Sequence, residues 1–386
     1  MDLAKELIGR AHELKPVIAA RALATEQKRS LLDETVKDLC DAGFMQILTP
    51  KRFGGHELHI DTMVEVARIF ASACPSTGWV SAFYIGHNWL HAVFPEKSQE
   101  EVFANQPYQL SAGQISPTAT AVRVKGGYEL SGRQAWSSGV VHSDYVFFTG
   151  MVQGEDAPAH PLMFLVPMAN VEVIDNWYIT GMKGTGSQDV AVEKVFVPDY
   201  HTVSFLALIE GKHPGGTVHA NPLYSLPAIT VLSFEALPVL VGALRGAAEN
   251  FLETSRNRYN SYTGASVAAK PATQMRLGRA FGNVEAADAL LRAAVAKTME
   301  IGKSGAVPPQ VRAELRMQVG LITKLCCDGV NDIVHGAGGN SFRDDHPLQR
   351  FFRDVNVLRT HAALDIEPTS ELFGRMLLGM DPGGAV

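Results

Sequence analysis

Residues 121–139 of the chain read AVRVKGGYELSGRQAWSSG. The segments Ala121–Val124 and Tyr128–Leu130 flank Lys125-Gly126-Gly127, a pattern typical of two strands joined by a tight turn. Further strand-like runs follow at 145–148, 162–166 and 190–197, and strand character stops near Pro198. The sequence therefore predicts a strand-rich segment in the middle of the chain.

Helical spacing of apolar residues dominates on both sides of this segment. Before it, apolar residues recur with helical spacing from Leu31 to Cys40, and Cys74-Pro75-Ser76-Thr77 suits the start of a helix over 78–94. After it, long periodic stretches without strand character cover 247–259, 273–301 and 308–336. The order predicts an α+β fold of three domains: an N-terminal α-helical domain over 1–108, a β-barrel-like domain over 109–222, and a C-terminal α-helical bundle over 223–386.

Composition excludes several classes of protein. The 386 residues carry 34 Lys and Arg against 40 Asp and Glu, a net charge of −6, so we expect no nucleic-acid partner. Only 19% of residues are charged, which suggests surface hidden in an oligomer or around a large ligand. Four cysteines without a paired spacing, and no signal-like N-terminus, predict a cytoplasmic protein with reduced thiols.

Two further features are interpreted conservatively. The apolar stretch from Tyr224 to Leu244 contains Glu235 and two prolines, so we expect a linker running into a buried helix and no membrane partner. His87 and His91 are four residues apart and could share one helix face, but no third ligand is evident, so we expect no metal. The histidines either pack in the core or face a pocket. No dinucleotide fingerprint, P-loop or nucleophile elbow is present.

Four segments in order resemble the acyl-CoA dehydrogenase superfamily. They are the strand-turn-strand and its end over 127–139, the run GMKGTGS at 181–187 with its following strand, the region 256–274 with its arginines, and PLQRFFRD at 347–354. The resemblance covers about residues 110–365 and implies an acyl-CoA dehydrogenase-like fold with a C-terminal four-helix bundle. It also implies that Arg353 and Asp354 form a structural ion pair.

The sequence departs from the dehydrogenases directly after this last segment. Where those enzymes carry a catalytic glutamate, this chain has Ala362, preceded by His361, and alanine cannot accept a proton. The runs 184–187 and 361–365 instead are similar to the two-component flavin-dependent monooxygenases built on this fold, which include oxygenases of p-hydroxyphenylacetate, steroid phenols, dibenzothiophene and indoles.

That resemblance implies a specific activity. Reduced FMN or FAD would come from a separate NAD(P)H-flavin reductase, react with O₂ to form a flavin hydroperoxide, and hydroxylate a small aromatic or heteroaromatic molecule of phenol, indole or polycyclic type. It also implies a homotetramer. A flavin dehydrogenase of acyl thioesters and a nitroalkane oxidase or N-oxygenase on the same fold are the alternatives.

The resemblance assigns the flavin to five residues. Ser138 would donate a hydrogen bond beside the flavin ring nitrogen N5 as a catalytic and cofactor-binding residue. Trp136 would either pack near the isoalloxazine or fill the core of the β-domain. Thr185 and Ser187 lie on a glycine-containing loop that can approach a ligand closely. Arg258 would bind the flavin phosphate, with Arg256 a close second.

The substrate side of the predicted site rests on a second group. His361 would supply or position a proton as O₂ adds, and His87 would pair with a phenol or indole N–H of the substrate. Phe83 and Trp89 would line a flat pocket unless they are core residues. Gln114 would contact the substrate where the phenol hydroxylases have a nearby serine, which leaves room for indoles, polycyclic aromatics or sulfur heterocycles.

Overall fold

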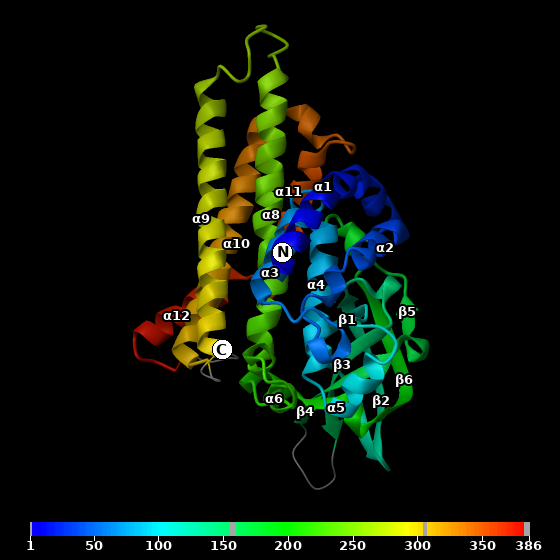
Figure 1. The fold of residues 1–386 in the computed structure, drawn as a ribbon. Helices are drawn as coiled ribbons and strands as arrows, with labels where there is room; N and C mark the ends of the chain where they lie inside the picture. Colours follow the sequence, from blue (N-terminus) through cyan, green and yellow to red (C-terminus); the bar gives the residue numbers. More distant parts are fainter. Residues whose placement is uncertain (1, 154–159, 304–306, 382–386) are drawn as a thin grey trace.

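The computed structural model describes residues 2–153, 160–303 and 307–381, and it confirms the α+β class. Helices come first, a sheet follows, and long helices complete the chain (Figure 1). The N-terminal helices are α1 (Leu3–Lys28), α2 (Asp33–Asp41), α3 (Ile60–Ala71), α4 (Pro75–Ala92) and α5 (Glu96–Val102). Helix α4 contacts both strand β1 and helix α8, so it lies between the sheet and the C-terminal helices (Figure 1).

The middle of the chain forms one seven-stranded sheet in the order β5-β6-β2-β1-β3-β4-β7. Its strands are β1 (Ser111–Val124), β2 (Gly127–Ser137), β3 (Tyr145–Gln153), β4 (His160–Pro167), β5 (Glu172–Ile174), β6 (Gln188–Pro198) and β7 (Thr202–Ser204). The predicted β1–β2 hairpin is present, with Val124 opposite Gly127. Strands β5 and β7 end the sheet without pairing to each other, so the expected barrel-like arrangement is an open sheet.

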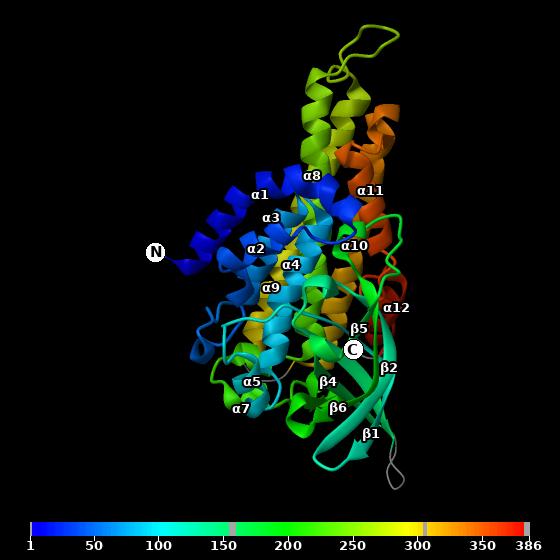
Figure 2. The ribbon, with the colours of Figure 1, turned by 90° about the vertical axis from the view of Figure 1, so that its right-hand side faces the viewer.

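The long C-terminal helices stand side by side and extend past the rest of the molecule (Figures 1 and 2). They are α8 (Ala228–Asn257), α9 (Pro271–Gly302) and α10 (Pro309–Ala337), followed by α11 (Pro347–Leu358) and α12 (Ile366–Leu377). The short helices α6 (Phe205–Glu210) and α7 (Gly215–Val218) precede them. The stretch expected to run from a linker into a buried helix does so: α8 begins at Ala228, directly after Pro227, and continues through Pro238.

Helix α8 is the core helix of the molecule. By length and composition it could cross a membrane, but 78% of its most apolar window is buried inside the fold. Gly242 and Gly246 let it approach α3 closely: a Cβ atom on Gly242 would lie 2.3 Å from the carbonyl oxygen of Arg68. Its apolar character is therefore explained by packing against α3, α4 and α10.

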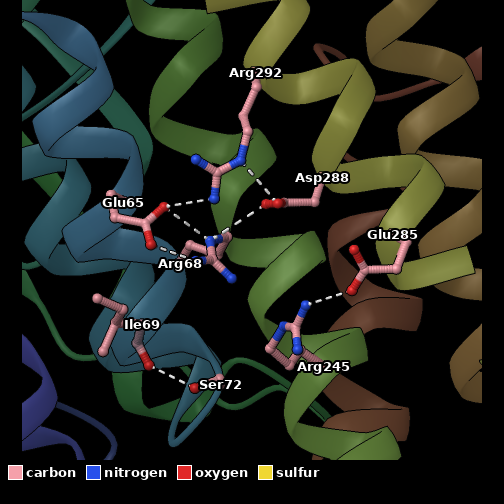
Figure 3. Close-up of polar contacts among 8 residues, drawn as sticks. All are labelled: Glu65, Arg68, Ile69, Ser72, Arg245, Glu285, Asp288 and Arg292. Atoms are coloured by element: carbon pink, nitrogen blue, oxygen red, sulfur yellow. Dashed lines mark hydrogen bonds and ion pairs between the residues drawn. The ribbon is translucent and has the colours of Figure 1, made fainter. Parts of the chain in front are cut away.

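Buried charges join α3 to α9 across α8 (Figure 3). Arg68 of α3 contacts Glu65 on its own helix and Asp288 of α9, and Arg292 of α9 pairs with both carboxylates. The side chains of Arg68, Glu65 and Asp288 are only 11%, 18% and 14% exposed. Arg245 of α8 pairs with Glu285 of α9 at 3.0 Å beside this group. Arg292 and Glu285 remain 61% and 72% exposed, so only the three poorly solvated charges, Arg68, Glu65 and Asp288, depend strongly on their partners.

Replacing Arg68 by Met should destabilise the fold by about 3 kcal/mol, since two poorly solvated carboxylates lose a partner. Urea unfolding followed by circular dichroism measures the loss. Lys37→Ala is the matched control, because the Lys37–Asp41 pair is 73% and 61% exposed and should contribute less than about 1 kcal/mol. Equal losses in the two variants would show that the buried network does not hold α3 against α9.

Candidate active site

Three hydroxyl groups predicted from the sequence form one hydrogen-bonded chain. Ser138 follows directly after β2, and its Oγ atom accepts a hydrogen bond from Nε1 of Trp79 at 3.0 Å. The Oγ atoms of Ser138 and Ser187 are 2.8 Å apart, and Oγ of Ser187 lies 2.6 Å from Oγ1 of Thr185. Thr185 in turn lies 2.9 Å from the carbonyl oxygen of Met182, which can only accept.

This geometry fixes the direction of the chain. The Thr185 hydroxyl donates its one hydrogen to the Met182 carbonyl and can only accept from Ser187. Ser187 therefore donates to Thr185, and Ser138 donates to Ser187. All three hydroxyls are buried. A ligand atom that accepts a hydrogen bond from the Ser138 hydroxyl must therefore displace Ser187 as the acceptor. The Ser138 oxygen already accepts a hydrogen bond from Trp79.

The loop over 181–187 has its shape because α11 holds it. Met182 has a left-handed backbone (φ 55°), and its N–H donates to Oδ1 of Asp354 at 2.5 Å. Arg353 donates to the carbonyl of Thr180. A Cβ atom on Gly181 would lie 2.4 Å from the Arg353 carbonyl oxygen, so only glycine fits there. Helix α11 thus positions the loop that carries Thr185 and Ser187.

The carboxylate partner of Arg353 differs from the one expected. Arg353 pairs with Glu26 of α1 at 2.6 Å, and no ion pair joins it to Asp354 within the described residues. Asp354 is buried, and burial raises the pKa of its carboxyl to about 7, against the opposing pull of the Met182 N–H and of Arg353 and Arg350. The predicted ion pair is therefore wrong, because Glu26 reaches Arg353 from a helix more than 300 residues earlier in the chain.

Helix α4 carries a row of rings that leads away from the hydroxyl chain. Trp79 and Phe83 stack with centroids 4.7 Å apart, and Phe83 meets His87 edge-on at 5.4 Å. At the other end, the ring of His361 lies 5.5 Å from Trp79. Phe83 is the single residue of α4 that is not buried. The middle of the row therefore borders accessible space, with polar groups at both ends.

His87 has one committed nitrogen and one free nitrogen. Its Nδ1 lies 2.6 Å from the carbonyl oxygen of Ser111, which only accepts, so Nδ1 carries the proton. Nε2 is then an acceptor, and it has no hydrogen-bond partner in the described part of the chain. Burial lowers the pKa of His87 to about 4, so the ring is neutral near pH 7.

His91 shares Ser111 with His87, through the serine hydroxyl, which lies 2.7 Å from Nε2 of His91. Burial lowers the pKa of His91 as well, and the nearby His87 adds to this effect. Each histidine therefore uses one ring nitrogen on Ser111. Among the residues with described positions, no group of three metal-ligating side chains occurs.

His361 differs from His87 because solvent reaches it. It lies just after α11, and its Nδ1 accepts a hydrogen bond from the backbone of Ala363 at 3.2 Å. Neighbouring residues remove part of the hydration of the ring, and this, followed by the charge of Arg316, lowers the pKa of His361. The ring can therefore exchange protons with solvent while it contacts Trp79.

Four predicted site residues lie outside this group. Trp136 is 57% exposed with φ 66° and meets Trp177 edge-on, so its alternative placement in the sheet core is wrong. Trp89 is fully buried and donates to the Leu223 carbonyl at 2.9 Å. Gln114 is half-buried on β1, where its carbonyl accepts from Thr149.

The arginine proposed for the flavin phosphate is the fourth. Arg258 follows the last residue of α8 and donates to the carbonyl of Ala337, near the start of α11. Helix α11 has 12 residues and is about 18 Å long, and it separates the Arg258 region at its start from His361 just after its end. Arg256 is exposed and pairs with Glu253, so of the two arginines Arg258 is the one held in place.

A separate cavity lies on the other side of α8. Its lining includes Thr230, Ser233 and Leu237, together with Arg312 and Arg316 of α10. On a helical wheel, positions 230, 233 and 237 lie roughly opposite position 235, which faces α4. The cavity is thus distinct from the row on α4.

Comparison with known proteins connects this geometry to one family. Residues 236–366 match the family model described as acyl-CoA dehydrogenase, C-terminal domain. The chain is 43% identical over 98% of its length to a "Pigment production hydroxylase" from a Rhodococcus species, of which it covers 98%. It is 32% identical to the "Flavin-dependent monooxygenase, oxygenase subunit HsaA" of Mycobacterium tuberculosis, over 98% of this chain and 97% of the relative. The chain belongs to the family of flavin-dependent monooxygenase oxygenase components.

Solved structures agree. The crystal structure of the M. tuberculosis HsaA monooxygenase superposes with a TM-score of 0.93, at 32% identity and over 99% of both chains. XiaF from a Streptomyces species, solved "in complex with FADH2 and Glycerol", gives the same TM-score at 29% identity, over 100% of this chain and 98% of that chain. The expectations of an acyl-CoA dehydrogenase-like fold and of a flavin-dependent monooxygenase are both confirmed.

The residues of this oxygenase component fit a flavin. An isoalloxazine is flat, largely apolar and rimmed by hydrogen-bonding atoms. Around Ser138 the chain offers an exposed indole in Trp136, buried hydroxyls in Ser138, Ser187 and Thr185, and a ring row on α4. Trp79 and Asp354 hold two parts of this arrangement; no role is predicted for Trp79 from the sequence, and Arg353, not Met182, is the expected partner of Asp354. The spacing of Trp79, four residues before Phe83, was a signal that could have found the first.

Stability should fall as pH rises through the titration of Asp354. Its folded pKa of about 7 exceeds the value near 4 of an unfolded chain, so the folded state binds more protons between about pH 4 and 7. Asp354→Asn keeps an acceptor for Met182 but removes this contribution, worth up to about 1.4 kcal/mol per pH unit. Chemical unfolding at pH 5 and pH 8 should show a smaller fall for the variant. Identical slopes would contradict a neutralised Asp354.

Proposed function

We propose that the chain takes reduced FMN or FAD from a separate NAD(P)H-flavin reductase and hydroxylates an aromatic or heteroaromatic compound that carries a hydroxyl or a ring N–H. One observation carries this proposal: His87 presents a neutral acceptor nitrogen without a partner at the end of a row of aromatic rings. Relatives with 27–29% identity are named for p-hydroxyphenylacetate, resorcinol and indole-3-acetate. Each of those compounds is a ring with a hydroxyl or N–H group.

His87 acts on the substrate through a hydrogen bond. A histidine whose pKa is about 4 is too weak a base to remove a phenolic proton at neutral pH. As an acceptor, Nε2 draws the substrate O–H or N–H toward itself, which raises electron density on the ring and favours attack on an electrophilic oxygen. Phe83 provides the flat apolar surface beside it.

A reduced flavin bound here would supply the two electrons needed to make one oxygen atom of O₂ reactive toward the substrate ring. Ser138 holds its hydroxyl at the flavin edge, and Thr185 and Ser187 orient that hydroxyl. Trp136 would pack against the flavin ring system, and Arg258 would bind a flavin phosphate. His361 moves protons between solvent and the Trp79 end of the row.

The proposal includes a homotetramer in the cytoplasm. Large apolar side chains are exposed along the C-terminal region: Tyr262 is 96%, Leu377 70% and Leu378 78% exposed. Apolar surface of this kind is typical of a contact between subunits. Gln114 is kept as a substrate contact, whereas Trp89 is not, because it is fully buried and its N–H donates to the Leu223 carbonyl.

Isotope labelling tests the activity. The protein is mixed with photoreduced FMN or FAD and ¹⁸O₂ in the presence of phenol, resorcinol, indole or 5-hydroxyindole, without NAD(P)H. We expect a hydroxylated product that contains one ¹⁸O atom. Absence of labelled product from every compound, together with flavin reduction by an acyl-CoA under anaerobic conditions, would favour the dehydrogenase alternative instead.

His87→Asn is the matched variant for this experiment. Asparagine can keep the donor on the Ser111 carbonyl but does not extend to the position of Nε2. We expect kcat/KM for hydroxylation to fall about tenfold, equivalent to one hydrogen bond, while oxidation of the reduced flavin continues. Unchanged hydroxylation would remove His87 from the substrate contact.

Ser138→Ala should uncouple oxygen use from hydroxylation. The variant leaves Nε1 of Trp79 without its acceptor and ends the hydroxyl chain at Ser187. We expect the ratio of released hydrogen peroxide to product to rise about fivefold, the equivalent of one hydrogen bond of about 1 kcal/mol. Ser143→Ala is the control, since Ser143 donates to the carbonyl of Gly139 and is not part of the hydroxyl chain. If both serine variants give the same ratio, Ser138 has no such role.

A further inference from the structure

Helix α8 buries a carboxyl group that nothing in the described structure satisfies. Glu235 is 2% exposed, and its Oε1 atom has no hydrogen-bond partner. No hydrogen bond or ion pair reaches either carboxyl oxygen from the residues with described positions. Burial raises the pKa of Glu235 well above its usual range, which favours the neutral carboxylic acid over the carboxylate.

This carboxyl lies directly against the substrate side of α4. A Cβ atom on Gly86 would be 1.9 Å from Oε1 and 2.7 Å from Cδ of Glu235, so the acid occupies the space that a side chain at 86 would fill. Gly86 precedes His87 and lies three residues after Phe83, on the same face of the helix. The acid therefore lies beside the row of rings, next to the one position of α4 that is not buried.

The isolation of Glu235 is costly for the fold. A buried polar group without a hydrogen bond loses its hydration and receives nothing in exchange, and the great majority of such groups in native proteins have partners. Leucine has a similar volume and would avoid that cost at this position. A local violation of this kind is expected where a ligand provides the missing partner.

We propose that Glu235 is a specificity-determining residue, whose carboxylic acid hydrogen-bonds a second polar group on the aromatic substrate that His87 holds by its hydroxyl or ring N–H. This inference rests on the substrate role proposed above for His87. A neutral acid offers one donor and one acceptor, so it matches an uncharged hydroxyl, carbonyl or amide. The substrate class is therefore an aromatic ring system with two uncharged polar groups, because a compound with one such group leaves Glu235 unpaired.

Paired compounds test the inference in the full-length protein. Phenol is compared with catechol and resorcinol, and indole with 4-, 5- and 6-hydroxyindole. One readout is kcat/KM with photoreduced FMN, and the second is the dissociation constant of each compound from isothermal titration calorimetry without flavin. Glu235→Leu removes the polar group, and Glu235→Gln keeps its shape with a changed donor pattern. Thr298→Val is the matched control, since Thr298 on α9 is a fully buried hydroxyl without a partner, away from α4.

We expect the wild type to prefer at least one two-group compound over its one-group partner by about tenfold in both readouts. Glu235→Leu should bring that ratio close to one and raise the midpoint of thermal unfolding, whereas Thr298→Val should keep the wild-type ratio. The inference is overturned if Glu235→Leu keeps the wild-type preference for two-group compounds, or if the wild type shows no such preference. If Glu235→Leu does not fold, Glu235→Met decides by the same ratio, because methionine also lacks a hydrogen-bond donor.

The binding readout separates this inference from the proposed function. If no compound is hydroxylated but the binding ratio depends on Glu235, the activity assignment fails and the recognition role stands. If hydroxylation occurs and the ratio does not depend on Glu235, the activity stands and the recognition role fails.

Discussion

The hydrogen bond from the Met182 N–H to the buried carboxyl of Asp354 is the contact on which the site depends. It holds Met182 in a left-handed conformation, and the carbonyl of the same residue accepts the hydrogen bond of the Thr185 hydroxyl. From there the direction of each hydroxyl as far as Ser138 is determined. One residue of α11 thus sets the hydrogen-bonding state of a serine at the end of a strand more than 200 residues earlier.

Two chemical environments meet at Trp79. On one side are the hydroxyls of Ser138, Ser187 and Thr185, which suit the polar edge of a flavin. On the other side are Phe83 and His87, which suit an aromatic substrate with a hydrogen-bonding group. The indole of Trp79 belongs to both, because its N–H donates to Ser138 and its ring stacks on Phe83. Contact between cofactor and substrate is therefore expected beside this residue.

The sequence predicted the residue types of the site better than their partners. The hydroxyls at 138, 185 and 187 and the histidines at 87 and 361 could be found from motifs, and the structure brings them together around Trp79. The partners could not be found, since Asp354 lies 172 positions from Met182 and Glu26 reaches Arg353 only through the packing of α1 on α11. The sequence could have shown that Trp89 does not share the substrate site with His87. Two positions along a helix correspond to a rotation of about 200°, so the two side chains point to different faces. The exposure of Trp136 depends on a positive φ that the sequence does not reveal.

A crystal structure of the protein with reduced flavin, solved under anaerobic conditions, tests the central claim most directly. The account predicts that the ring nitrogen edge of the flavin lies within hydrogen-bonding distance of Ser138 Oγ, with the Phe83–His87 side of α4 facing the open space beside it. A flavin ring bound elsewhere, with Ser138 still enclosed between Trp79 and Ser187, would contradict it.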